Sequence, residues 1–216
     1  MKKLIIYGTG LIAEVAEFYF KTDTDYQVSA FTNAAEFIDQ EQFNGKPLVQ
    51  FEKLENVYSP AEYDIFIALG YAKTNQVREQ RYEEAKEKGY SCATYISSRA
   101  TYYNTPVGDN CFIFENNVIQ PFVTIGNNVT IWSGNHIGHH SRIKDHCFIS
   151  SHVVISGMCC IEENCFLGVN STFRDNITIG KFTVIASGAI VMKDCKERSL
   201  VRPSRSDYAQ VEHDLI

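Results

Sequence analysis

Apolar residues recur at every sixth position through the second half of the chain. Fifteen consecutive positions of this register are apolar: Val107, Ile113, Ile119, Ile125, Ile131, Ile137, Ile143, Ile149, Ile155, Ile161, Leu167, Phe173, Ile179, Ile185 and Val191. This spacing fits neither a helix, with its period of about 3.6, nor an ordinary strand, with its period of about 2. It fits a chain that turns a triangular corner every six residues and points one side chain inward per side. We therefore expect a parallel β-coil in which residues about 18 apart lie one above another.

The residue four positions after each of these apolar residues is nearly always small. Five of the seven cysteines occupy this phase: Cys111, Cys147, Cys159, Cys165 and Cys195. A narrow prism has room for one large and one small inward residue per side, because close packing excludes anything bigger. We therefore expect these cysteines to fill the core, and neither to bind metal nor to form disulfides. Unpaired cysteines also favour a reducing compartment.

Composition divides the chain in two. Eleven of the twelve tyrosines lie at or before Tyr103. We expect a first domain over residues 1–97, a coil over 98–195 and a tail over 196–216. The net charge of −6 and the lack of a basic block argue against nucleic acid as a partner. No apolar run is long enough to span a membrane, and the start of the chain lacks the features of a signal peptide, so we expect a cytoplasmic protein without a membrane partner.

The chain begins with the pattern of a strand, a glycine turn and a helix. Residues Lys3 to Tyr7 form a short apolar run, and Gly8, Thr9 and Gly10 follow it. Such a turn exposes backbone N–H groups at a helix N-terminus to a phosphate, and Ala13 occupies the third place of the dinucleotide-binding fingerprint. A purely structural turn is the alternative. The helix is expected to bury one face with Leu11, Val15 and Phe18.

Further apolar runs predict a small α/β domain. The expected elements are strands at Tyr26 to Phe31, Asp64 to Leu69 and Cys92 to Ile96, and a helix at Thr74 to Lys88. Ligands of such sheets bind at the carboxyl ends of the strands. We therefore expect a substrate crevice at Gly8, Thr9, Gly10, Asn33, Gly70 and Tyr71, in a domain too short for a full NAD site.

Five of the six histidines fall within seventeen residues: His136, His139, His140, His146 and His152. His139 stands two residues after an inward aliphatic, hence at an outward corner, and Gly157 should lie directly above it. A neutral imidazole can accept a proton at neutral pH, and an amide one coil away can stabilise a developing oxyanion. The alternative is that the histidines only form a polar surface, as we expect for His146 and His152. His213 has no assigned role.

Several motifs resemble the NeuD and PglD type of sugar acyltransferase, within the hexapeptide-repeat superfamily. They are Ile137-Gly138-His139, Ile155-Ser156-Gly157, the segment from Cys165 to Ser171, the segment from Ala186 to Val191, and the segment from Val201 to Arg205. The resemblance implies an N-terminal Rossmann-like domain that holds a sugar nucleotide, followed by a left-handed parallel β-helix. It also implies a homotrimer with active sites between subunits, and acetyl-CoA along the C-terminal coils.

The resemblance also implies roles for individual residues. His139 would be the general base and Gly157 the backbone donor to the thioester carbonyl. Val169 and Ser187 would contact pantetheine through their backbones, and Arg205 would approach the phosphates or adenine of acetyl-CoA. Two features depart from the family. His140 replaces the acidic residue that often follows the base, which leaves the group that orients His139 unidentified, and the segment from Val201 to Pro203 is larger and more polar than usual.

The leading hypothesis is an acetyl-CoA-dependent N-acetyltransferase that acts on a nucleotide-linked amino sugar, without a metal. O-acetylation of an acidic sugar of the sialic-acid type is the closest alternative. A zinc lyase would need His136, His139 and His140 to converge, which their spacing makes difficult. A covalent mechanism through Cys159 or Cys160 and a non-catalytic, ice-binding or scaffolding solenoid are further alternatives.

Overall fold

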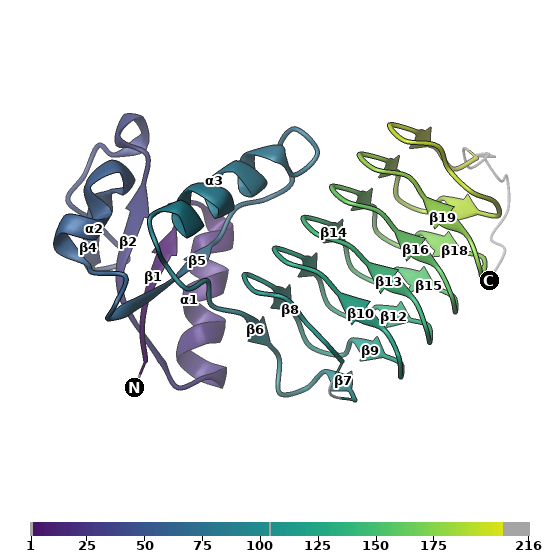
Figure 1. The fold of residues 1–216 in the computed structure, drawn as a ribbon, viewed down its shortest axis with the longest axis horizontal. Coiled ribbons are helices and arrows are strands. Elements are labelled where there is room, and N and C mark those ends of the chain that lie inside the picture. The colour runs from purple at the N-terminus through teal and green to yellow at the C-terminus, as the bar shows by residue number, and fades with distance from the viewer. Residues whose placement is uncertain (1, 104, 205–216) are drawn as a thin grey trace, which may run out of the picture.

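The computed structural model of the protein describes residues 2–103 and 105–204, which form an α/β domain followed by a β-coil (Figure 1). The sheet of the first domain has the order β3-β4-β2-β1-β5, and all pairs except β3 with β4 are parallel. Its strands are β1 (Lys2–Tyr7), β2 (Tyr26–Asn33), β3 (Gln42–Phe43), β4 (Lys46–Gln50) and β5 (Tyr63–Ile67). Its helices are α1 (Leu11–Asp23), α2 (Leu54–Val57), α3 (Gln76–Glu87) and the short 3-10 helices η1 (Ala35–Phe37) and η2 (Phe51–Lys53).

The expected α/β elements are present, and β3, β4, α2 and the two 3-10 helices are additional. Residues 46–50 form β4, a strand that the sequence analysis did not predict. The strand expected from Cys92 to Ile96 is divided: Cys92 makes an isolated bridge to Ile65, whereas β6 (Tyr95–Ile96) pairs with a strand of the coil. The second half of that prediction was therefore wrong, because the chain has already left the first sheet at Tyr95.

The buried face of α1 also differs from the expectation. Leu11 and Phe18 are 78% and 60% exposed, whereas Ala13, Ala16 and Phe20 are buried. Ala13 and Ala16 are small because the helix packs closely on the sheet; a Cβ on Gly8 would lie 3.6 Å from the Cβ of Ala13. The prediction was therefore wrong for Leu11 and Phe18, whereas Val15 packs partly buried against the core, because apolar residues occur on both sides of this helix.

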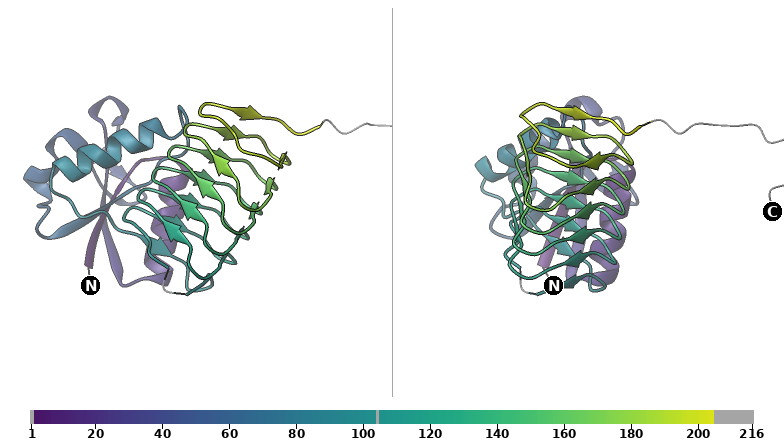
Figure 2. Two further views of the ribbon diagram at one scale, coloured as in Figure 1. Left: turned by 45° about the vertical axis from the view of Figure 1, so that its right-hand side comes forward. Right: turned by 90° about the vertical axis from the view of Figure 1, so that its right-hand side faces the viewer.

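The second domain is a three-sided coil, and each side is a parallel sheet (Figure 2). The first face consists of β6, β8 (Phe112–Ile113), β11 (Thr130–Ile131), β14 (Phe148–Ile149), β17 (Phe166–Leu167), β20 (Val184–Ile185) and β22 (Leu200–Val201). The second face consists of β7 (Thr101–Tyr102), β9 (Val118–Ile119), β12 (His136–Ile137), β15 (Val154–Ile155), β18 (Thr172–Phe173) and β21 (Ile190–Val191). The third face consists of β10 (Thr124–Ile125), β13 (Arg142–Ile143), β16 (Cys160–Ile161) and β19 (Thr178–Ile179).

The sixfold apolar register forms the core of this coil, as predicted. Val107 is partly buried and the other fourteen residues of the register are buried. Strands pair with an offset of 18 residues through most of the coil, so that Ile137 stacks on Ile119 and beneath Ile155. The small residues of the second inward phase are buried with them, including Cys111, Cys147, Cys159 and Cys165. All seven cysteines are free thiols.

The last coil is shorter than the others. Ile179 bridges Cys195, and Val184 pairs with Leu200, an offset of 16 residues in each case. Cys195 therefore occupies the strand position and not the small inward position that we expected. This shortening explains why the sixfold register ends at Val191 although β-structure continues to Val201. The domain limits at residues 97 and 195 remain a prediction.

Each corner of the coil between residues 110 and 188 contains one residue with left-handed backbone conformation. Fourteen such residues recur at intervals of six from Asn110 to Gly188, with φ between 51° and 79°. Six are asparagine, three are histidine (His140, His146 and His152), and the rest are glycine, phenylalanine and methionine. Asparagine and histidine adopt this conformation more readily than most residues. Three of the clustered histidines thus occupy the same position within the six-residue repeat.

The first domain packs on the first face of the coil and on the corner between the third and first faces. Phe112 and Phe114 of the coil join the core that contains Phe20 and Phe66. Arg78 of α3 is 1% exposed, and its guanidinium donates five hydrogen bonds. The acceptors are the side chain and carbonyl of Asn128 and the carbonyls of Gly70, His146 and Cys147, at 3.1–3.2 Å. Burial lowers the pKa of Arg78 to about 10, and the carbonyls satisfy its protons.

We expect the inward aliphatic column to dominate the stability of the coil. Replacement Ile125→Ala removes a side chain that is 4% exposed and leaves a cavity, which should lower the free energy of unfolding by about 2–5 kcal/mol. The matched control is Thr124→Ala, because Thr124 precedes Ile125 in the same strand and its side chain is exposed. Urea unfolding of both variants checks this; equal midpoints would contradict the packing described here.

Candidate active site

His139 and Gly157 lie against each other in successive coils, at the corner between the second and third faces. A Cβ built on Gly157 would come within 2.7 Å of Cε1 and 2.8 Å of Nε2 of His139. The imidazole therefore rests directly on the Cα of the glycine, and a side chain at this position would have to displace the ring. The structure thus brings together the two residues that the sequence predicted to be neighbours; their roles remain predictions.

A second histidine holds the imidazole of His139 from the other side. Nδ1 of His139 lies 3.1 Å from Nδ1 of His140. The ring of His140 packs on the ring of Phe122 one coil below, with 4.6 Å between centroids. The backbone N–H of His139 donates to Oε1 of Gln120 at 2.9 Å. The sequence analysis did not find these supports, although the 18-residue offset places Phe122 beneath His140.

The backbone amide of Gly157 is the second polar group at this corner. No backbone carbonyl of residues 2–103 and 105–204 accepts a hydrogen bond from its N–H. By contrast, the N–H of His139, at the equivalent position one coil below, is bound by Gln120. The site therefore combines an imidazole with an adjacent backbone donor, the pair needed for proton transfer beside a developing oxyanion.

The residues expected to bind the cofactor lie at a different edge. Val169 and Ser187 are exposed and follow β17 and β20, at the corner between the first and second faces. They are neighbours in successive coils, because the N–H of Gly188 donates to the carbonyl of Val169 at 2.8 Å. Within a single chain, Val169 and Ser187 are not close to Gly157, because the second face of the coil lies between their edge and the edge that carries Gly157. Arg205 lies outside the described residues.

The glycine turn of the first domain has the geometry that the sequence predicted. Gly8 has φ of 122°, and a Cβ there would lie 3.0 Å from the carbonyl oxygen of Ala68, so the turn passes close to the end of β5. Gly10 precedes α1, and a Cβ on it would meet no atom within 4 Å. The N-terminal amides of α1 are therefore open to a ligand, and a helix N-terminus favours an anion.

A cavity of about 460 Å³ adjoins this turn at the carboxyl ends of β1 and β2. It is lined by Thr9, Asn33, Glu36, Phe37, Asp39, Gln40 and Leu48. Nδ2 of Asn33 donates to the hydroxyl of Thr9 at 3.0 Å, so these two predicted residues share one wall. The carboxylates of Glu36 and Asp39, which the sequence analysis missed, supply acceptors for hydroxyl or ring N–H groups.

Gly70 and Tyr71 lie between the first domain and the coil. A Cβ on Gly70 would lie 3.3 Å from Cδ1 of Ile12, near the start of α1. Tyr71 is 54% exposed and packs its ring on Phe148 and Phe166, at centroid distances of 5.0 and 4.6 Å. Gly70 thus borders the turn, while Tyr71 extends over the first face of the coil.

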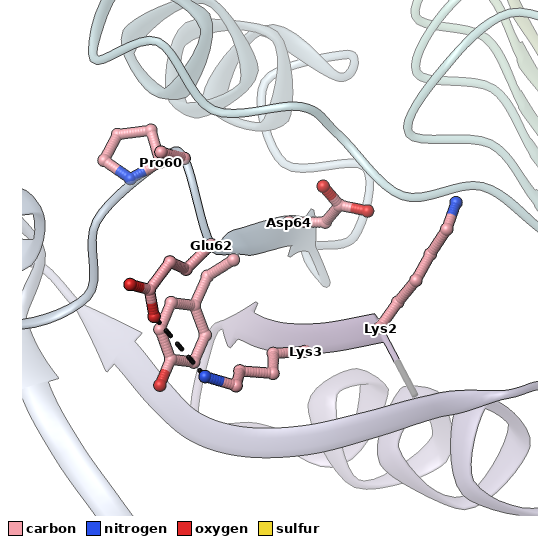
Figure 3. Close-up of a pocket in the computed structure, with 7 residues that line it drawn as sticks. Lys2, Lys3, Pro60, Glu62 and Asp64 are labelled. Carbon is pink, nitrogen blue, oxygen red and sulfur yellow. Dashed lines mark hydrogen bonds and ion pairs between the residues drawn. The ribbon is translucent and has the colours of Figure 1, made fainter.

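A second cavity, of about 410 Å³, opens at the opposite end of the sheet (Figure 3). Lys2, Lys3, Glu62 and Asp64 line it, at the starts of β1 and β5. Nζ of Lys3 pairs with Glu62 at 3.4 Å and lies over the ring of Tyr63. Because ligands of parallel sheets bind at the carboxyl ends of the strands, and because Glu62 offsets the charge of Lys3, we do not assign the nucleotide to this cavity.

The remaining histidines have separate environments. His136 is in β12, and His152 is an exposed corner residue. His146 is only 8% exposed and bonded to Nδ2 of Asn128 at 3.0 Å, so its expected surface position was wrong. Burial lowers the pKa of His146. Within residues 2–103 and 105–204, no three His, Cys, Asp or Glu side chains are grouped in a way that could hold a metal ion.

The cysteines near the site are poor nucleophiles. Cys159 is 1% exposed, and its thiol donates to the carbonyl of Arg174 at 3.2 Å. Burial raises the pKa of Cys159 and that of Cys160. Both thiols therefore favour the protonated form, whereas the thiolate is the attacking species. This environment disfavours the covalent alternative.

Comparisons with known proteins agree with the two-part fold. Residues 3–85 match the PglD N-terminal domain, and residues 104–138 and 123–157 match the bacterial transferase hexapeptide, a family of six repeats. The acetyltransferase domain of PglB from Neisseria gonorrhoeae is similar, with a TM-score of 0.82, 22% identity, and coverage of 94% of this chain and 100% of that one.

Two further solved structures are similar over nearly the whole chain. A histidine-to-asparagine mutant of perosamine N-acetyltransferase from Caulobacter crescentus, in complex with CoA and GDP-perosamine, has a TM-score of 0.82, 20% identity, and coverage of 95% and 98%. WeeI from Acinetobacter baumannii has a TM-score of 0.72, 17% identity, and coverage of 94% and 99%. These matches confirm the expected fold class, a Rossmann-like α/β domain followed by a left-handed parallel β-helix.

The contact between His139 and Gly157 leads to a structural prediction. Replacement Gly157→Ala places a methyl group 2.7 Å from Cε1 of His139, so the imidazole must move away from the corner. The control is Gly10→Ala, because a Cβ at Gly10 meets nothing within 4 Å. Crystal structures of both variants check this, and an unmoved His139 ring in Gly157→Ala would contradict the described packing.

Proposed function

We propose that the protein is an acetyl-CoA-dependent N-acetyltransferase of nucleotide-linked amino sugars. The chain combines a match to the PglD N-terminal domain with matches to bacterial transferase hexapeptide repeats, and this is the organisation of the NeuD/PglD-type sugar acyltransferases. The acceptor is a sugar such as a 4-amino-4,6-dideoxyhexose, in the synthesis of a bacterial surface glycan. Perosamine N-acetyltransferase, which has a similar fold, was solved with CoA and GDP-perosamine. The free cysteines favour a cytoplasmic location.

One observation carries this proposal: the imidazole of His139 lies on Gly157, whose amide has no backbone acceptor among residues 2–103 and 105–204. In the proposed reaction the sugar amine attacks the thioester carbonyl of acetyl-CoA. Nε2 of His139 accepts a proton from the amine, and the N–H of Gly157 stabilises the oxyanion. The C–S bond then breaks as the amide C–N bond remains, and the proton returns to the departing sulfur to give CoA.

The nucleotide occupies the first domain in this proposal. The diphosphate lies beside Gly8, at the amides of Thr9 and Gly10, and the nucleoside enters the cavity beside Asn33. Gly70 and Tyr71 border the path of the sugar toward the coil. No metal is needed for these contacts, because the helix N-terminus supplies the donors to the phosphates.

The arrangement of the faces supports a site between subunits. The first domain packs on the first face, whereas His139 lies at the edge between the second and third faces. Val169 and Ser187 lie at yet another edge. We therefore propose a homotrimer in which the edge of one subunit that carries His139 and Gly157 meets the Val169 and Ser187 edge of the next, with acetyl-CoA between them. Arg205 would contribute to the nucleotide end of acetyl-CoA.

Loss of the proposed base should abolish most turnover. Replacement His139→Ala is expected to lower kcat about 100-fold or more, because it removes the group proposed to accept the proton of the amine. Thiol release from acetyl-CoA, measured with GDP-, UDP- and dTDP-linked 4-amino sugars, checks this. The same panel should include free sialic acid, since turnover with that hydroxyl acceptor alone would favour the O-acetyltransferase. Turnover near the wild-type value in His139→Ala would remove the proposed role.

Binding of a nucleotide should stabilise the folded protein. One of GDP, UDP and dTDP is expected to raise Tm, because a ligand that binds only the folded state shifts the unfolding equilibrium; at 100 times Kd the gain is about 2.7 kcal/mol. Replacement Gly10→Val should remove the shift by covering the amides at the start of α1, while Lys3→Ala at the opposite end of the sheet should preserve it. A shift unaffected by Gly10→Val would locate the nucleotide elsewhere.

A further inference from the structure

The contact between the rings of His139 and His140 requires one proton between their Nδ1 atoms. Their Nδ1 atoms are 3.1 Å apart, within hydrogen-bond distance. A hydrogen bond between two ring nitrogens requires N–H on one and a lone pair on the other. If both rings are neutral, one histidine therefore carries its proton on Nδ1 and the other on Nε2. Which one does so decides whether Nε2 of His139 can accept a proton.

Both residues of the pair are exposed, and neighbouring residues contact each ring. His140 packs on Phe122, which limits rotation of its ring. His139 is held through its backbone, because its N–H donates to Gln120 and its carbonyl accepts from the N–H of Met158 at 2.8 Å. Gly157 closes the remaining side of the His139 ring. The contact between the two Nδ1 atoms is thus supported by the neighbouring residues of the corner.

We propose that His140 is a positioning residue for His139. Its Nδ1 lone pair accepts a hydrogen bond from Nδ1–H of His139, and this bond holds His139 in the tautomer with an unprotonated Nε2. This role depends on the proposed function, in which Nε2 of His139 receives the proton of the acceptor amine. When that proton arrives, Nδ1–H of the imidazolium continues to donate to His140, so the ring keeps its orientation through the reaction.

The chain itself supplies replacements that preserve the backbone at this corner. His140 has φ of 60°, and Phe122, Met158 and Asn176 occupy the equivalent left-handed positions of the same edge. Asparagine keeps an acceptor, because its Oδ1 can take the place of Nδ1, whereas methionine provides bulk without an equivalent acceptor. A comparison of His140→Asn with His140→Met therefore separates hydrogen bonding from packing and backbone strain.

The kinetic test uses acetyl-CoA and the nucleotide-linked 4-amino sugar with the highest turnover. We expect His140→Met to lower kcat about 10–100-fold, the usual effect of removing a partner that orients a ligand or base, with KM for acetyl-CoA changed less than about twofold. His140→Asn should keep kcat within about threefold of the wild type. The control Asn44→Met replaces an exposed residue that is also left-handed, with φ of 47°, in the turn between β3 and β4, and should leave kcat unchanged.

A second measurement needs no substrate. In protein labelled with ¹⁵N-histidine, the two-bond ¹⁵N–¹H correlations of the imidazoles report which nitrogen carries the proton. We expect Nδ1–H for His139 and Nε2–H for His140 at neutral pH, with the signals assigned by single replacements. His140→Met should convert His139 from a single tautomer to a mixture.

The possible results separate this inference from the proposed function. No thiol release by the wild-type protein with any of the nucleotide-linked amino sugars overturns the proposed function, whereas full turnover in His139→Ala overturns the role of His139 as base. A loss of turnover in His139→Ala together with wild-type kcat in His140→Met overturns only the positioning role. Detection of the Nε2–H tautomer of His139 in the wild-type protein overturns the positioning role as well, even if a variant of His140 fails to fold.

Discussion

The vertical stacking of aliphatic side chains inside the coil determines the rest of the structure. Ile119, Ile137 and Ile155 lie in one column because each strand pairs with the strand 18 residues away. A shift of one residue would turn an entire strand outward, so the buried column fixes the register. The same register decides which corner residues meet. His139 rests on Gly157 because the columns on either side of this corner cannot slip.

The coil could be predicted from the sequence because its signal repeats. Each six-residue unit adds the same information, so an error at one position is corrected by fourteen others. The helix α1 occurs once, and its apolar residues surround it: Leu11 and Phe18 are exposed, while Phe20 is buried. Periodicity alone could not choose the buried side. The shortened last coil could not be predicted either, because Cys195 satisfies the sixfold pattern and is nevertheless paired with Ile179.

The histidine cluster shows why residue type is a weaker guide than backbone position. His140, His146 and His152 share the left-handed corner with six asparagines. Their accumulation therefore has a structural cause that is independent of chemistry. His146 is buried and bonded to Asn128, and His152 is exposed. Only His140 is placed next to another imidazole at an outward edge, and the sequence could not reveal this, because ring orientation depends on Phe122 in the coil below.

The candidate site also depends on how the first domain sits on the coil, which no motif encodes. Arg78 reaches the carbonyls of His146 and Cys147, and Nδ2 of Asn75 donates to the carbonyls of Asn164 and Cys165. Backbone carbonyls are present in any sequence, so these contacts leave no pattern of complementary residues. They nevertheless fix the glycine turn relative to the three edges of the coil, because Arg78 binds the carbonyl of Gly70 as well. The first domain is thereby held beside the first face, whereas His139 lies at the edge between the second and third faces, and this separation is the basis of the proposed site between subunits.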